Sequence, residues 1–226
     1  MSRIILSLSG GMDSATLLGV ALSEGHDVSA VGFTYGSKHN PYENKASQAL
    51  AGFYHVPYEL VDLSGVMAAF KSDLLRTGGE IPEGHYEEES MSRTVVPGRN
   101  LIFISVLAGV AWSKEATEVW VGIHSGDHAI YPDCRPAFYY SMDTALRRGT
   151  DERVVLKAPF LHENKTSIIK MGHAIGVPYQ LTRTCYKDQP IACGKCGSCQ
   201  ERLEAFKANG VEDPVEYESR VILPRT

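Results

Sequence analysis

Short β-branched runs alternate with longer stretches of helical periodicity along most of the chain. The first run, Ile4 to Leu8, stops at a glycine turn, after which residues 15–22 are apolar around almost their whole circumference. The same alternation predicts further strands at 28–33, 58–61, 118–122 and 154–156, and further helices at 43–54, 101–112, 136–146 and 165–173. Such an alternation indicates an α/β fold, with an open, mostly parallel sheet covered by helices on both faces.

Residues 75–94 interrupt this pattern. They are rich in Gly, Pro, Glu and Ser, and three glutamates, Glu87 to Glu89, lie near their centre. This composition is typical of a solvated surface loop or of a lid over a ligand site, and the sequence leaves both interpretations open.

Composition narrows the class of protein. The chain has 226 residues with 22 Lys and Arg against 27 Asp and Glu, and the net charge of −5 argues against broad binding of nucleic acids or membranes. A chain of this length forms one large domain with room for a small appendage. No apolar run reaches the roughly 18 residues that span a bilayer, so we expect no membrane segment and a cytoplasmic location.

A glycine turn follows the first expected strand, with the sequence Ser9-Gly10-Gly11-Met12-Asp13-Ser14. Glycines let the backbone approach an anion, and the N-terminus of the following helix presents unpaired N–H groups there, which suits phosphate. Asp13 would repel a bare phosphate, whereas a magnesium-bound polyphosphate accommodates both the turn and the carboxylate. A plain turn in which Asp13 caps the helix is the alternative.

Four of the five cysteines lie within fifteen residues near the C-terminus. Cys193, Cys196 and Cys199 have C-x2-C-x2-C spacing, and Cys185 precedes them by eight positions. Four thiolates can complete a tetrahedral shell, which favours one structural zinc ion over the alternative, an iron–sulfur cluster. We therefore expect a zinc-binding segment at 181–226, packed on a larger domain at 1–180.

Two cations stand at expected helix starts. Lys165 opens the helix at 165–173, and Arg99 shortly precedes the helix at 101–112. A positive charge at a helix N-terminus opposes the helix dipole unless an anion lies nearby. Both residues are therefore candidate contacts for a polyphosphate or a carboxylate, or else solvated side chains that point away.

A polar loop follows the strand at 118–122 and should emerge at the same sheet edge as the glycine turn. An arginine can hold a carboxylate, an aspartate can accept hydrogen bonds from a guanine-like edge, and a tyrosine can stack on a flat ring. The alternative is a loop held by its own hydrogen bonds. The candidate substrate residues in this loop are Asp127, Tyr131, Asp133 and Arg135.

The glycine turn resembles the pyrophosphate loop of the ATP-pyrophosphatase superfamily, whose fold is that of the adenine nucleotide alpha hydrolases. The resemblance implies ATP contacts from Leu8 through Ser14, including Leu8, Ser9, Gly10, Gly11, Met12 and Asp13. It also implies an ATP-binding domain at 1–180 and cleavage of ATP between the α and β phosphates to adenylate an acid. Together with the two cations at helix starts, it makes Asp13, Lys165 and Arg99 the catalytic candidates.

Three further motifs resemble the 7-cyano-7-deazaguanine synthase family of the queuosine and deazaguanine pathway. They are Val96-Pro97-Gly98-Arg99-Asn100, Tyr131-Pro132-Asp133-Cys134-Arg135 and Thr184-Cys185-Tyr186, followed by the other three cysteines. The resemblance implies an ATP-dependent carbon–nitrogen ligase that converts 7-carboxy-7-deazaguanine and ammonia to the nitrile, with a bound zinc.

Other functions stay open on the sequence. A tRNA thiolase would use the same adenylation with an iron–sulfur site, and a related enzyme would pass the activated deazaguanine acid to another amine. A zinc-containing nucleotide-binding module without turnover is a third possibility. For the favoured ligase we expect small-molecule substrates, namely 7-carboxy-7-deazaguanine, ammonia and ATP. We also expect no nucleic-acid or membrane partner, and a symmetric homodimer.

Overall fold

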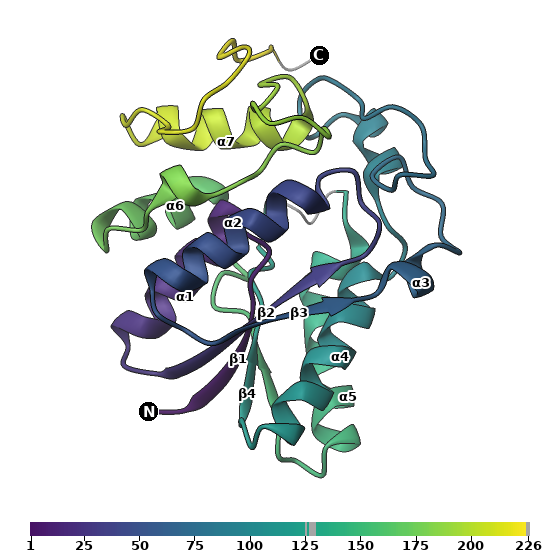
Figure 1. The fold of residues 1–226 in the computed structure, drawn as a ribbon, viewed down its shortest axis with the longest axis vertical. Helices are drawn as coiled ribbons and strands as arrows, with labels where there is room; N and C mark the ends of the chain where they lie inside the picture. Colours follow the sequence, from purple (N-terminus) through teal and green to yellow (C-terminus); the bar gives the residue numbers. More distant parts are fainter. Residues whose placement is uncertain (125, 127–129, 225–226) are drawn as a thin grey trace.

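A computed structural model describes residues 1–124, 126 and 130–224, and its centre is a five-stranded parallel sheet (Figure 1). The strand order is β3-β2-β1-β4-β5, and every neighbouring pair is parallel. The strands are β1 (Arg3–Ser7), β2 (Asp27–Thr34), β3 (Tyr58–Asp62), β4 (Glu118–Trp120) and β5 (Val155–Lys157). The chain adds strands outward from β1 on one side and then from β4 on the other, so the order reverses between β1 and β4.

Helices cover both faces of this sheet (Figure 1). One face packs against α4 (Arg99–Ser113) and α5 (Pro136–Gly149). The other packs against α1 (Met12–Ser23) and α2 (Asn40–Phe53), with α6 (Lys165–Ala174) on α1 and α7 (Gly197–Ala208) on α6. The short helices are α3 (Ser64–Met67), η1 (Glu89–Thr94), η3 (Pro132–Cys134) and η4 (Tyr179–Leu181).

The apolar run of β1 explains why both faces must be covered. Ile4, Ile5 and Leu6 are fully buried, and Ile5 joins the cluster under α4 while its two neighbours join the cluster under α1. A strand without a polar face can be buried only in the middle of a three-layer fold. The α/β fold with helices on both faces is therefore confirmed.

Most element bounds shift by a few residues from those expected, and two larger differences have a physical cause. The helix expected at 43–54 begins at Asn40, because Pro41 occupies its first turn and the Asn40 side chain accepts hydrogen bonds from the backbone N–H groups of Tyr35 and Ser37. Helix α7 was not expected at all. Its burial involves polar side chains, including Glu201 and Arg202, so it lacks an apolar stripe.

One helical stretch in the described part of the chain, Glu89–Ser113, is long and apolar enough to cross a membrane. It is interrupted by a turn in which Gly98 has φ +64°, and its longer part is α4. Ile104 and Leu107 of α4 are buried in the same cluster as β1 residues, as in the core helix of a globular domain.

The C-terminal segment packs on the sheet domain through two buried clusters. Ala205 and Phe206 of α7 lie in the cluster that contains Ile4, and the four clustered cysteines lie in the cluster that contains Ile5. Buried Arg202 ties α7 to its surroundings, because it donates to both carboxylate oxygens of Asp213 at 2.6 and 2.8 Å.

Candidate active site

A cavity opens at the carboxyl ends of β1 and β4, where the strand order reverses. This is the position at which open α/β sheets bind their ligands. Its walls come from the glycine turn, the start of α4, the loop after β4, the start of α6, the segment 86–91 and α7. The principal lining residues are Ser9, Gly11, Asp13, Phe33, Tyr35, His39, Arg99, Phe103, Tyr131, Cys134, Lys165, Tyr186 and Glu201.

The glycine turn is held in one shape by its own contacts. Gly10 has φ +84°, and a Cβ atom there would lie 2.6 Å from the carbonyl oxygen of Glu43, so only glycine fits. The Gly11 N–H donates to Ser9 Oγ at 3.2 Å, and Ser9 Oγ lies 3.1 Å from Ser14 Oγ. Two hydroxyls and the first N–H groups of α1 therefore line the cavity, where they can donate to an anion.

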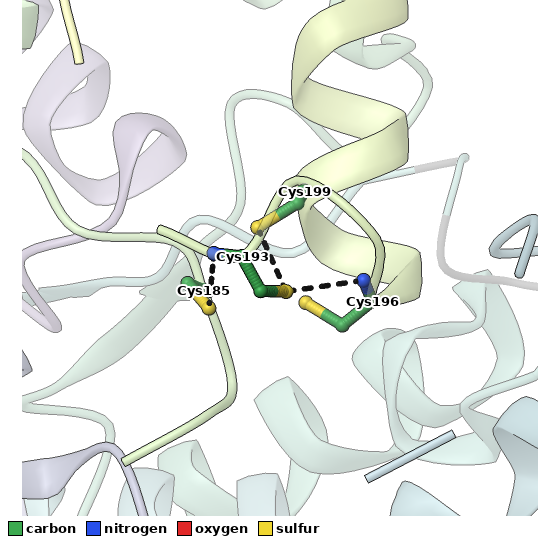
Figure 2. Close-up of side chains that lie close together, drawn as sticks. All are labelled: Cys185, Cys193, Cys196 and Cys199. Carbon is green, nitrogen blue, oxygen red and sulfur yellow. Dashed lines mark hydrogen bonds between the residues drawn. The ribbon is translucent and has the colours of Figure 1, made fainter. Parts of the chain in front are cut away.

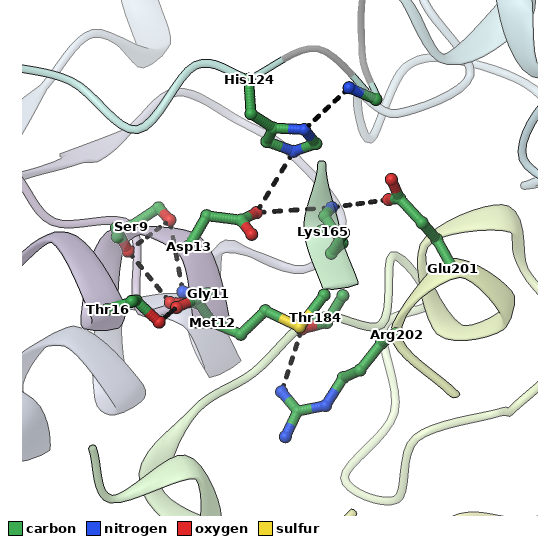
Figure 3. A network of polar contacts seen from close by, with 12 residues as sticks. Ser9, Gly11, Met12, Asp13, Thr16, His124, Lys165, Thr184, Glu201 and Arg202 are labelled. Carbon is green, nitrogen blue, oxygen red and sulfur yellow. Dashed lines mark hydrogen bonds and ion pairs between the residues drawn. The ribbon is translucent and has the colours of Figure 1, made fainter. Parts of the chain in front are cut away.

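A row of ionisable side chains in mutual contact lies beside the glycine turn (Figure 3). Lys165 Nζ lies 3.3 Å from Asp13 Oδ2 and 2.5 Å from Glu201 Oε2, and His124 Nε2 lies 3.7 Å from the same Asp13 oxygen. The other Asp13 oxygen, Oδ1, is buried without a hydrogen-bond partner among the described residues. A buried carboxylate oxygen of this kind is a suitable ligand for a divalent cation.

Aromatic rings line the part of the cavity next to Arg99. Phe33 and Phe103 stack with centroids 4.2 Å apart, and the Arg99 Nη1 donates to the Tyr35 hydroxyl at 3.4 Å. Burial by itself lowers the pKa of Arg99, but the neighbouring tyrosine hydroxyls, led by Tyr35, and the carboxylate of Asp133 raise it well above its ordinary value. A fixed cation beside flat apolar rings suits a planar, anionic ligand.

The predicted substrate residues fall in different places. Tyr131 lines the cavity, and its hydroxyl lies 3.0 Å from that of Thr94. Asp133 does not line it, because its Oδ2 accepts the backbone N–H of Asn100 at 2.8 Å and thereby caps α4. Arg135 is exposed at the start of α5, away from the cavity lining. Asp127 lies outside the described residues.

The sequence did not point to several ionisable groups that line the cavity, among them Arg183. Another is Glu201, on the unexpected helix α7. Two more are His39 and Glu43, whose Nε2 and Oε2 atoms lie 3.0 Å apart at the start of α2. The i, i+4 spacing of His39 and Glu43 is a signal that could have found them, but His39 lies before the helix expected at 43–54.

The four cysteines converge at the N-terminus of α7 (Figure 2). All are buried and free, and their Sγ atoms lie within 4.8 Å of one another, with Cys193 and Cys199 at 3.9 Å. A tetrahedral zinc site with Zn–S bonds of about 2.3 Å places its sulfurs about 3.8 Å apart, so the donor set fits.

The environment of the sulfurs favours thiolates at Cys185 and Cys193, whereas hydrogen bonds with these two residues raise the pKa of Cys196 and Cys199. Backbone N–H groups of Lys195 and Cys196 donate to Cys193 Sγ at 3.4 and 3.3 Å. The hydrogen bond with Cys193 raises the pKa of Cys185, but those with Cys196 and Cys199 outweigh it and bring the value to about 7. These residues could hold a metal ion without a vacant ligand position.

Comparison with known proteins agrees with this geometry. The family model described as "Queuosine biosynthesis protein QueC" matches residues 3–210. The chain belongs to this family. A protein from Pseudoalteromonas translucida named 7-cyano-7-deazaguanine synthase is 46% identical over 216 residues, which cover 96% of this chain and 99% of the relative. One from Methanoregula boonei with the same name is 45% identical with the same coverage.

A solved structure supports the fold independently. The chain of a predicted tRNA methyltransferase subunit from Methanocaldococcus jannaschii aligns with a TM-score of 0.53 at 12% identity, covering 94% of this chain and 91% of that one. At this identity the likeness shows the fold alone. The family resemblance expected from the three motifs is therefore confirmed by the family model and by the relatives.

Proposed function

We propose that this protein is an ATP-dependent carbon–nitrogen ligase that converts 7-carboxy-7-deazaguanine and ammonia to 7-cyano-7-deazaguanine. The observation that carries the proposal is one cavity in which an anion-binding turn and an aromatic compartment meet. Full-length similarity to proteins named 7-cyano-7-deazaguanine synthase supports it. Both relatives named above carry the synthase name, and the tRNA thiolase alternative is not better supported.

The reaction needs two activations because a carboxylate must lose both oxygens. In the first, the acid oxygen attacks the α phosphorus of ATP, pyrophosphate leaves, and ammonia then displaces AMP to form the amide. In the second, the amide oxygen attacks the α phosphorus of another ATP and pyrophosphate leaves; loss of AMP and of both amide N–H protons then gives the nitrile. Each oxygen is expelled on a phosphate, which makes a poor leaving group a good one.

The cavity supplies the groups that this chemistry needs. The turn from Ser9 to Ser14 binds the departing pyrophosphate through N–H groups and hydroxyls, and the backbone of Leu8 and Met12 completes the ATP contacts. Lys165 neutralises the charge that develops on the phosphates. A magnesium ion held by Asp13 would add positive charge to the same phosphates.

The aromatic compartment receives the flat deazaguanine. Phe33, Phe103 and Tyr131 offer ring faces for stacking, and Arg99 pairs with the carboxylate before it is activated. Asp127 stays a proposed contact for the purine edge. We do not propose Asp133 and Arg135 as substrate contacts, because the Asp133 carboxylate caps α4 and the Arg135 side chain is exposed.

We assign a single structural zinc ion to Cys185, Cys193, Cys196 and Cys199. The ion would hold the C-terminal segment 181–226 on the ATP-binding domain 1–180, and no step of the reaction involves it. Buried free thiols fit the reducing conditions of the cytoplasm. We also expect a homodimer without nucleic-acid affinity, which size-exclusion chromatography with light scattering and an RNA-binding assay would test.

A product assay tests the proposal. Purified protein is mixed with ATP, magnesium, ammonium and 7-carboxy-7-deazaguanine, and the products are followed by liquid chromatography and mass spectrometry. We expect the nitrile together with two AMP and two pyrophosphate per nitrile, and none of these with Asp13→Ala. ADP and phosphate as products, or no nitrile from well-folded protein, would contradict it.

A further inference from the structure

Helix α7 begins within the cysteine cluster and passes the ATP cavity one turn later. Cys199 contributes to the cluster, and Glu201, two residues on, lines the cavity. We propose that Glu201 is a positioning residue that holds Lys165 against the phosphate turn, so that the metal-bearing helix completes the ATP site. This inference rests on the proposed function, and it adds to the ATP site a residue that lies outside the sequence motifs described above.

The geometry at Lys165 carries the proposal (Figure 3). Its ammonium bridges Glu201 Oε2 at 2.5 Å and Asp13 Oδ2 at 3.3 Å. The side chains are nearly buried, with 11% of Lys165 and 8% of Glu201 exposed. A charge-assisted contact of this length between buried groups is among the stronger polar interactions in proteins.

Lys165 needs such an anchor for two physical reasons. It stands at the first position of α6, where the helix dipole repels a cation, and its long flexible stem loses rotamer freedom when the ammonium is fixed. Asp13 provides one anchor, but a magnesium ion on that carboxylate would compete for the same charge. Glu201 comes from a different element and would keep Lys165 in place when Asp13 is engaged by the nucleotide.

The neighbouring side chain on α7 separates this role from a purely structural one. Arg202 ties the helix to the fold through Asp213 and Thr182 and does not line the cavity. Glu201 makes its ion pair with Lys165 in the cavity instead. Loss of the Glu201 charge should therefore change nucleotide binding more than it changes the position of α7.

A double-mutant cycle tests the proposal with α,β-methylene-ATP, an analogue that cannot be cleaved at the reactive bond. Affinity is measured by calorimetry for the wild type, Glu201→Gln, Lys165→Met and the double variant. We expect Glu201→Gln to weaken binding about tenfold and Lys165→Met at least as much, because each removes part of a charged contact. The double variant should bind no more weakly than Lys165→Met, since Glu201 acts through Lys165.

Glu212→Gln is the matched control, because Glu212 lies just beyond the end of α7, is exposed and pairs with Arg220 instead of a group in the cavity. Its affinity should equal that of the wild type, and circular dichroism and metal content should be unchanged in all variants. Glu201→Gln binding as well as or more tightly than wild type would overturn the proposal, as would additive effects in the double variant.

The outcome is distinguishable from failure of the proposed function. The binding cycle needs no deazaguanine, so it can hold in a protein that makes no nitrile, and then only the proposed function fails. Normal nitrile formation with no coupling between Glu201 and Lys165 would remove only the positioning role. A wild type that binds no nucleotide would overturn both.

Discussion

Gly10 offers a sharp test of how the glycine turn is built, because an alanine there would have an unfavourable backbone conformation and would also overlap with neighbouring atoms. Its φ of +84° lies in the left-handed region. An added Cβ would lie 2.6 Å from Glu43 O, 2.8 Å from Ser47 N and 2.9 Å from Ala46 Cβ. Two of these atoms belong to the backbone of α2, so a side-chain rotation cannot relieve the overlap.

The cost follows from these two effects. A left-handed conformation costs an alanine about 1–2 kcal/mol, and overpacking against a fixed neighbour costs about 1–3 kcal/mol more. Gly10→Ala should therefore lower the free energy of unfolding by about 2–5 kcal/mol. In a domain of this size each kcal/mol lowers the melting temperature by roughly 2–4 °C, so the expected loss is roughly 4–20 °C.

Gly11→Ala is the matched control in the same turn. Gly11 has φ −75°, and an added Cβ would meet Ser9 Oγ at 3.3 Å and Arg183 O at 3.7 Å, which an alanine tolerates. Urea denaturation followed by circular dichroism should place Gly11→Ala within about 1 kcal/mol of wild type. Equal unfolding midpoints for the two variants, with unchanged slopes, would refute the reasoning about Gly10.

Cys196→Ser should lower the zinc content from one ion per chain and destabilise the protein, whereas Cys134→Ser should keep the zinc, as measured by elemental analysis; equal zinc in both would contradict the four-cysteine site. Arg202→Leu should lower the free energy of unfolding in urea by about 3–5 kcal/mol, because it leaves the Asp213 carboxylate buried without a counter-charge, with hydrogen bonds only from Val215 N–H and the Tyr217 hydroxyl. A loss below about 1 kcal/mol would contradict this. Burial raises the pKa of Tyr179 to about 12, so its neutral hydroxyl stabilises the fold by up to about 3 kcal/mol below pH 10, and this contribution is lost as the pH rises toward 12. Tyr179→Phe should therefore reduce the fall in the free energy of unfolding between pH 10 and 12. An unchanged fall in that range would refute this.

The parts of the fold that the sequence predicts are those decided by local apolar pattern. The buried run at Ile4 to Leu8 could be only a central strand, and the glycine turn after it could be only at a sheet edge. The cysteine spacing was equally informative, because ligands of one ion must lie close together wherever the chain runs between them. Each of these features is decided by the residues of one short segment, so it can be predicted without knowing which distant residues that segment contacts.

The parts that escaped prediction depend on pairs that are distant in sequence. Glu201 is buried because Lys165, 36 positions earlier, neutralises it, and nothing near Glu201 in the sequence indicates that partner. Asp133 was placed on the correct loop, but its carboxylate is used by the backbone N–H of Asn100, 33 positions earlier. A motif identifies which loop carries chemistry and does not reveal which polar atom is already used within the fold.

The segment 75–94, for which the sequence allowed a surface loop or a lid, is attached to the cysteine-bearing segment. Gly84 N–H donates to Lys195 O at 3.0 Å, Glu83 pairs with Cys196 in a β-bridge, and the buried His85 lies 3.2 Å from Glu204 on α7. Tyr86 and Met91, in the same segment, line the cavity. Because this wall is fixed at the cysteine cluster, it can move away from the cavity only if these contacts break. A metal ion held by the four cysteines would therefore stabilise two walls of the site at once, α7 and the segment 75–94, although none of their sulfurs takes part in the proposed chemistry.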